Sequence, residues 1–237
     1  MKLGKLPAKI PYGLGTLETY STAGRLPNPP AQLDYGGTIA DWGILGNDQY
    51  GDCTLAGTAH LIMAWDAEVD ATDTIPSSAQ VVDEYFLLTG GGDTGLAESD
   101  VLAEWCQKGL FGETIQGYAP VRGIKAIQQA IAFYGGAYLG VQLPQSAEEQ
   151  FRAGEGWTVQ PDSPILGGHA IIAIGYTPQD LRVVTWGKEI SVSYPWWEIY
   201  GEEAWAILPG QFVEEDHGPA AINLAALKAD LHGGFYA

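Results

Sequence analysis

The sequence has little cysteine: Cys53 and Cys106 are the only two in 237 residues. Two thiols form at most one disulfide, which is a poor framework for a chain of this length. We therefore expect both thiols to be free. Each is then either a small buried apolar side chain or a chemically active group.

Basic residues are also scarce. Lys and Arg number 11 against 29 Asp and Glu, which gives a formal charge of −18. An acidic surface repels phosphate backbones and anionic lipid headgroups. The composition therefore predicts no nucleic-acid partner and no membrane partner.

Long apolar runs are missing as well. No segment reaches the roughly 20 apolar residues of a transmembrane helix, and the first residues lack the apolar core of a signal peptide. We expect a cytoplasmic protein, or a virion-associated one if it is phage-encoded. A phage or bacterial origin fits free thiols in a reducing compartment.

The patterns of metal and cofactor sites are absent too. The two cysteines and four histidines contain no pair at metal-ligand spacing. The glycine run at 90–92 lacks the Lys-Ser/Thr ending of a phosphate-binding loop. The acidic stretch at 66–73 lacks the glycine and closing glutamate of a calcium loop, so it is interpreted as a solvated turn. We expect no metal and no cofactor.

The two ends of the chain are interpreted as segments outside the main domain. Residues 1–46 hold five prolines and are interpreted as an extended arm over a body, with a partly disordered leader as the alternative. An inhibitory pro-segment is disfavoured, because such segments are usually helical and charged. Residues 209–237 are interpreted as a tail, and arm and tail are candidate contacts to a protein assembly.

Between the ends, helical patterns come first and strand patterns follow. The apolar spacing predicts helices and then strands, with a short helix at 195–201; the main ranges are helices at 54–65, 79–88, 99–108 and 121–133, and strands at 137–143, 169–176, 181–186 and 204–208. This order favours an α+β domain over 47–208, with a helical lobe at 47–135 and a sheet lobe at 136–208.

Chemistry is concentrated at two points. Cys53 follows a polar turn and precedes a helical run, so its thiol lies where helix N–H groups favour a thiolate and a developing oxyanion. His169 opens a dense apolar run, typical of a buried strand, and is available as the base. The working hypothesis is a Cys53–His169 pair; packing alone is the alternative for each residue.

Four segments together resemble one known family. They are the Gly51-Asp52-Cys53 turn, the helix and strand of 124–143, the histidine strand of 168–176, and the Trp-Gly and final strand within 183–207. In this order they are similar to the papain-like cysteine peptidases, in the broad sense that includes the bacteriocin-processing peptidases. The resemblance covers roughly residues 45–208 and implies a two-lobed fold with a cleft between the lobes.

The resemblance also implies roles for residues. Cys53 matches the nucleophile and His169 the base of a thiolate–imidazolium pair. Asn47, six residues before the cysteine, matches the oxyanion-hole amide, and Gln49 is the second candidate; the Cys53 N–H is the other donor. The remaining residues are expected to line the substrate site: Gly51, Asp52, Gly168 and Trp186.

One position departs from the family pattern. Val184 stands where the family has the asparagine that orients the histidine, and valine accepts no hydrogen bond. Thr185 takes this role if the pattern shifts by one residue; another group or a water molecule is the alternative. Loss of an orienting partner lowers a rate and does not abolish the chemistry.

The sequence therefore predicts a cysteine peptidase or amide hydrolase that acts on a peptide or protein through an acyl-enzyme. Two alternatives remain. One is a hydrolase of cell-wall peptides, whose Tyr-Gly-x-Cys-Thr pattern resembles residues 50–54, although the 116 residues from Cys53 to His169 exceed the usual gap. The other is a catalytically lapsed papain-like structural or binding protein, for example a phage particle component.

Overall fold

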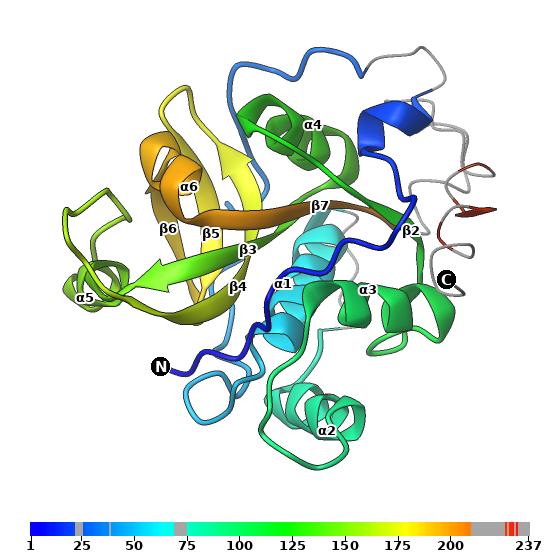
Figure 1. Ribbon diagram of the computed structural model, residues 1–237, viewed down its shortest axis with the longest axis horizontal. Helices are drawn as coiled ribbons and strands as arrows, with labels where there is room; N and C mark the ends of the chain where they lie inside the picture. The colour runs from blue at the N-terminus through cyan, green and yellow to red at the C-terminus, as the bar shows by residue number, and fades with distance from the viewer. Residues whose placement is uncertain are drawn as a thin grey trace.

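The fold is described from a computed structural model, which defines residues 1–21, 26–37, 39–68 and 75–209 and positions 226, 228, 229 and 231. Within these residues an antiparallel sheet of seven strands has the order β2-β7-β3-β4-β5-β6, with β1 paired to β4 (Figure 1). The strands are β1 (Leu33–Asp34), β2 (Ile115–Pro120), β3 (Ala137–Pro144), β4 (Ile165–Tyr176), β5 (Asp180–Thr185), β6 (Lys188–Ser193) and β7 (Gly201–Pro209).

Helices cover this sheet. They are the 3-10 helix η1 (Leu17–Tyr20) and α1 (Cys53–Glu68), α2 (Ser78–Leu88), α3 (Glu98–Gln107), α4 (Ile124–Tyr134), α5 (Gln145–Ala153) and α6 (Tyr194–Tyr200). Helix α1 packs on β4 and has α2 and α3 on its other side, so every residue from Cys53 to Asp66 is buried (Figure 1). The core of the molecule therefore surrounds α1 along most of its length.

The predicted α+β class is confirmed, and the sequence analysis missed the short elements η1 and β1 and three longer ones. Strand β2 lies in the half that was expected to be helical, and α5 and β6 occupy segments left without assignment. Strand β4 also begins earlier than expected, so His169 lies inside the strand and does not open it. The expected tail at 209–237 lies almost wholly outside the described residues.

The hairpin between β5 and β6 has a direct bearing on the site. Thr185 pairs with Lys188, so Trp186 and Gly187 form a two-residue turn. Both turn residues have positive φ, 45° and 73°, which is the conformation of a type I′ hairpin turn. The turn ends β5 at Thr185 and carries Trp186 back over the sheet.

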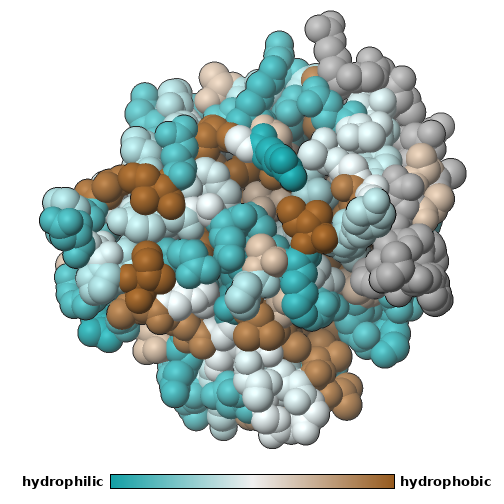
Figure 2. Space-filling view, in the orientation of Figure 1, coloured by the Kyte–Doolittle hydropathy of each residue, from teal (hydrophilic) through white to brown (hydrophobic). Residues whose placement is uncertain are grey.

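The first residues of the chain run across the front of the molecule, between the sheet and the α2–α3 side (Figure 1). Lys5 forms a parallel bridge with Leu96 just before α3. On the same face, the hydrophobic residues with assigned colour lie in separate groups among hydrophilic ones (Figure 2). The N-terminal segment thus fills the space between the two sides.

None of the helices in the described residues has both the length and the apolar character that crossing a membrane requires. No group of three or more His, Cys, Asp and Glu side chains in the same ranges is placed to hold a metal ion.

Candidate active site

Cys53 is the first residue of α1, and the turn before it is locked by polar contacts. Asn47 Nδ2 donates to Tyr50 O at 3.1 Å. The Gly51 N–H donates to Asp93 Oδ1 at 2.8 Å. These contacts fix the point at which the helix begins, so the thiol lies beside the first N–H groups of α1.

His169 comes from β4, which packs against α1, and Thr185 holds its ring. The distance from His169 Nε2 to Thr185 Oγ1 is 2.8 Å. Strands β4 and β5 are neighbours, and alternation of side chains along β5 points Thr185 and Val184 to opposite faces. Thr185, at the last position of β5, therefore provides the contact, and Val184 does not.

Trp186 forms the other support of the imidazole. Its ring stacks on that of His169, with centroids 4.5 Å apart and an angle of 21° between the planes. The Trp186 indole N–H donates to Lys2 O at 3.5 Å. The histidine is therefore held by a hydroxyl on its edge and an indole on its face, and only 1% of its surface is exposed.

A Thr185→Val variant is expected to lower the free energy of unfolding by about 1 to 3 kcal/mol, because it leaves a buried ring nitrogen without its partner. Valine keeps the shape of threonine and removes only the hydroxyl. Urea denaturation measures the change, and Thr185→Ser, which keeps the hydroxyl, is the matched control. Equal losses in the two variants would contradict a role for the hydrogen bond.

The thiol and the imidazole are both neutral in this arrangement. Burial raises the pKa of Cys53 to about 11; the Ala170 and Gly4 N–H groups oppose the shift. Burial lowers the pKa of His169 to about 3. No hydrogen bond joins the two side chains, since His169 Nδ1 has no partner among the described residues. Burial therefore favours the neutral side chains over the thiolate–imidazolium pair that the resemblance implies.

The two candidates for the oxyanion-hole amide differ in placement. Asn47 is buried and its amide is directed to Tyr50 O. Gln49 is exposed in the same turn. The remaining donor, the Cys53 N–H, lies at the start of α1, where it has no partner within the helix.

Asp52, directly before the cysteine, is fully buried. Burial raises the pKa of its carboxyl to about 7, and the Asn47 amide and its own backbone N–H offset only part of that rise. A carboxylate oxygen lies 2.6 Å from the position that a Cβ on Gly46 would take. Asp52 is thus placed beneath the turn, whereas Gly51 faces Gly4 and Gly168 faces Lys5.

Sequence reasoning predicted an arm over the body but did not place it over the cysteine. Residues 2–6, here called the covering segment, pass directly over Gly51 and Gly168: a Cβ on Gly4 would lie 1.7 Å from Gly51 O, and a Cβ on Gly168 would lie 2.3 Å from Lys5 O. The Gly4 N–H also reaches the Cys53 thiol.

The covering segment is extended and belongs to residues 1–46, which the sequence analysis interprets as an extended arm over a body without placing it at the cysteine. Its backbone is paired on both sides. Lys5 N donates to Gly168 O at 3.3 Å, Leu6 N donates to Leu96 O at 2.9 Å, and Leu96 N donates to Gly4 O at 2.9 Å. Glycine at position 4 was the only available signal, because it allows this close approach.

Comparisons with known proteins define the class of fold. No protein-family model matches the chain, and no curated protein matches it. Among solved structures, xylellain, a cysteine protease from Xylella fastidiosa, is 14% identical with a TM-score of 0.68, over 87% of this chain and 96% of that one. A procathepsin B from Trypanosoma congolense is 13% identical with a TM-score of 0.62, over 87% and 86%.

A third solved structure agrees with these two. Procathepsin L2 from the larval midgut of Tenebrio molitor is 15% identical with a TM-score of 0.62, over 87% of this chain and 78% of that one. The predicted papain-like fold is therefore confirmed. The TM-scores establish the fold. Because the sequence identities are low, the chemistry has to be argued from this chain's own residues.

Proposed function

We propose that this chain is a cysteine peptidase or amide hydrolase that cleaves a peptide or protein through an acyl-enzyme on Cys53. The observation that supports this most directly is the 2.8 Å contact of His169 Nε2 with Thr185 Oγ1. His169 directly precedes Ala170, whose N–H reaches the Cys53 thiol at the start of α1. If Nε2–H donates to the threonine, Nδ1 carries the lone pair that a base needs. The papain-like fold is one in which this chemistry occurs.

The reaction begins with transfer of the Cys53 thiol proton to His169 Nδ1. The thiolate attacks the carbonyl carbon, and the electron pair of the C=O bond moves to oxygen, where the Cys53 N–H stabilises it. The imidazolium gives its proton to the amide nitrogen as the C–N bond breaks. A water molecule, deprotonated by His169, then attacks the thioester, and the acid leaves as the thiol is restored.

Substrate access requires the covering segment to move, because only 1% of the Cys53 surface is exposed. Opening also rehydrates the site, which removes the cause of both pKa shifts. The neutral pair is thus the resting form, and the thiolate–imidazolium pair belongs to the open form.

The test is alkylation of Cys53 by iodoacetamide across pH 4–9 in a Gly4→Val chain, which cannot seat the covering segment against Gly51. Labelling is expected to persist below pH 7, and to follow an ordinary thiol pKa of about 8.5 when His169→Ala is added. Mass spectrometry of the Cys53 peptide gives the rate, and the half-buried Cys106 is the internal reference.

One observation favours a lapsed binding protein as the second candidate: Cys53 and His169 are neutral and not hydrogen-bonded to each other. In that case, labelling of the Gly4→Val chain follows an ordinary thiol titration with and without His169. Such a result would reject the peptidase proposal.

A further inference from the structure

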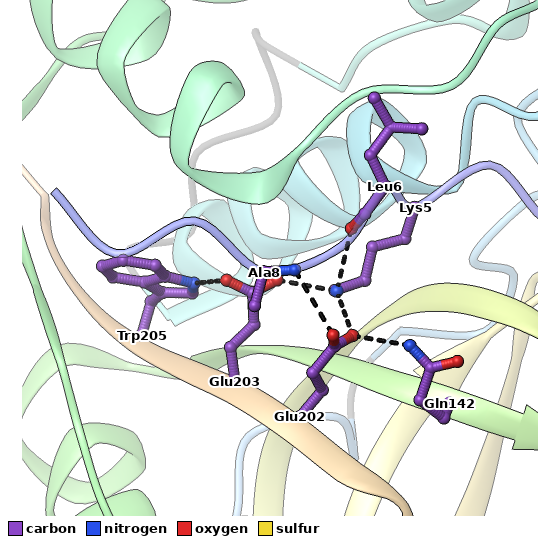
Figure 3. Close-up of polar contacts among 7 residues, drawn as sticks. All are labelled: Lys5, Leu6, Ala8, Gln142, Glu202, Glu203 and Trp205. Carbon is purple, nitrogen blue, oxygen red and sulfur yellow. Dashed lines mark hydrogen bonds and ion pairs between the residues drawn. The ribbon is translucent and has the colours of Figure 1, made fainter.

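The side chain of Lys5 points toward the carboxyl groups of Glu202 and Glu203 (Figure 3). Its Nζ lies 2.7 Å from Glu202 Oε2 and 2.7 Å from Glu203 Oε1, and donates to Leu6 O at 3.1 Å. The Lys5 side chain has no exposed surface. The Lys5 side chain is therefore as fully enclosed as that of a core residue. Ion pairs with two glutamates hold it in place.

Four residues form the pocket of the Lys5 side chain, here called the acidic pocket: Glu98 at the start of α3, Gly140 in β3, and Glu202 and Glu203 in β7. A Cβ on Gly140 would lie 2.0 Å from Lys5 Cε and 2.9 Å from Glu98 Oε1. The missing side chain at Gly140 thus provides the space in which the lysine stem lies.

Groups other than Lys5 hold the carboxylates of Glu202 and Glu203 in place. The Trp205 indole N–H donates to Glu203 Oε2 at 3.0 Å, and Gln142 Nε2 donates to Glu202 Oε2 at 2.9 Å (Figure 3). Both donors come from the sheet and remain when the covering segment leaves. The acidic pocket is therefore a built site and is not assembled by the lysine itself.

The charges of the pocket suit a cation. Burial alone would lower the pKa of Lys5, but Glu98, Glu202 and Glu203 outweigh burial and raise it. Burial raises the pKa of Glu98 well above its usual range, with Glu203 adding to the effect. Three carboxyl groups thus face one ammonium group, and a neutral side chain of equal length would leave buried carboxylates unpaired.

The pocket also lies next to the thiol. Gly4, whose N–H reaches Cys53, directly precedes Lys5, and the Glu98 carboxyl contributes to the raised pKa of Cys53. Lys5 N pairs with Gly168 O, one residue before His169. A peptide that follows this path across Cys53 places one of its side chains at the acidic pocket.

We propose that the acidic pocket is a substrate subsite that selects a lysine or arginine side chain, and that Lys5 occupies it in the covered form. This inference rests on the proposed function, since it names the class of peptide that the same cleft takes. The contacts that carry it are the two ion pairs of Lys5, the enclosure of its side chain, and the space at Gly140.

Binding tests the subsite without any need for catalysis. The full chain carrying Gly4→Val and Lys5→Ala is titrated with fluorescein-labelled Leu-Gly-Lys-Leu-Pro-amide and with the same peptide containing norleucine in place of lysine. We expect the lysine peptide to bind at least tenfold more tightly, as measured by fluorescence anisotropy. Equal affinities for the two peptides overturn the proposal.

Two further variants show which carboxylates carry the preference. Glu203→Gln is expected to reduce the preference for lysine to threefold or less, whereas Glu198→Gln, an exposed glutamate of α6, leaves it unchanged. Glu202, at the more open edge of the pocket, provides a second variant, Glu202→Gln, with the same expected direction if Glu203→Gln does not fold. An unchanged preference in a folded pocket variant contradicts the assignment.

Labelling of Cys53 separates the subsite from the chemistry. Tripeptidyl acyloxymethyl ketones with lysine or norleucine at each position in turn react with the same chain, and the rate of Cys53 modification is measured. Faster reaction of one lysine probe supports both proposals. Reaction without a charge preference rejects the subsite and keeps the function; preferential binding without any reaction keeps the subsite and rejects the function.

Discussion

Replacing Gly4 with valine is expected to raise the rate of Cys53 alkylation by iodoacetamide at pH 7 by about a hundredfold or more. A side chain at this position meets backbone and not a movable side chain, because its Cβ would lie 1.7 Å from Gly51 O and 2.6 Å from Gly51 Cα. The covering segment must therefore lift away from Gly51, and the Gly4 N–H leaves the thiol.

The size of the effect follows from the thiolate fraction. With a pKa of about 11, about one thiol in 10⁴ is ionised at pH 7; with an ordinary pKa of about 8.5, about 3% are. The ratio is roughly 300, before any gain from access of the reagent to the sulfur. A thiolate–imidazolium pair would raise the rate further.

Gly37→Val is the matched control for this change. Gly37 also lies in the first 46 residues, and a Cβ there would meet no atom within 4 Å. Its variant is expected to label Cys53 at the wild-type rate. Wild-type labelling in the Gly4→Val chain as well would show that the covering segment does not protect the thiol.

The sequence predicts the parts of the site that depend on residues close together in the chain. A polar turn, a cysteine and a helical run specify the start of α1, and a dense apolar run specifies the strand that holds His169. Both depend on neighbours in the chain, so periodicity and turn chemistry were enough to find them. The α+β fold followed from the order of these patterns.

The sequence offered Thr185 as a partner of His169 but could not decide whether the two side chains meet. The identity of the partner depends on which face of β5 each residue occupies, and the hairpin turn at Trp186 and Gly187 fixes that register. The Trp-Gly pair was interpreted only as part of a family motif. Recognition of the pair as a hairpin turn would also have predicted β6.

The acidic pocket and the position of the covering segment over Cys53 could not be predicted, because distant residues create them. Lys5 and Glu202 are separated by 197 positions. In a chain with 29 acidic residues, adjacent glutamates usually indicate a solvated surface. The pairing of β3 with β7 brings Gly140 opposite Glu203. No local sequence pattern predicts the register of these two strands.

An Asp52→Asn variant is expected to be more stable than the wild type at pH 8, with an advantage about 2 to 4 kcal/mol larger than at pH 4. The amide keeps the shape of a protonated carboxyl and carries no charge. The site of the change is fully buried, and no hydrogen bond satisfies either carboxylate oxygen among the described residues. The variant removes the free-energy cost of ionising the Asp52 carboxyl in the folded chain.

The sign of the pH dependence follows from the direction of the pKa shift. Burial raises the pKa of Asp52 from 3.8 to about 7, so the folded chain favours the protonated form. The stabilising contribution is complete below the unfolded pKa and is lost as the pH rises through about 7. Urea denaturation of both chains at pH 4, 6 and 8 measures the widening difference.

Asp93 provides a control of opposite sign. The Tyr85 hydroxyl and the Gly51 N–H lower the pKa of its carboxyl, so its contribution is present above the unfolded pKa and is lost as the pH falls. Asp93→Asn is therefore expected to destabilise the chain more at pH 8 than at pH 4. If Asp52→Asn follows the same direction as Asp93→Asn, Asp52 is a stabilising carboxylate. The Asn47 amide and the Asp52 N–H, which lower its pKa, would then be enough to hold the charge.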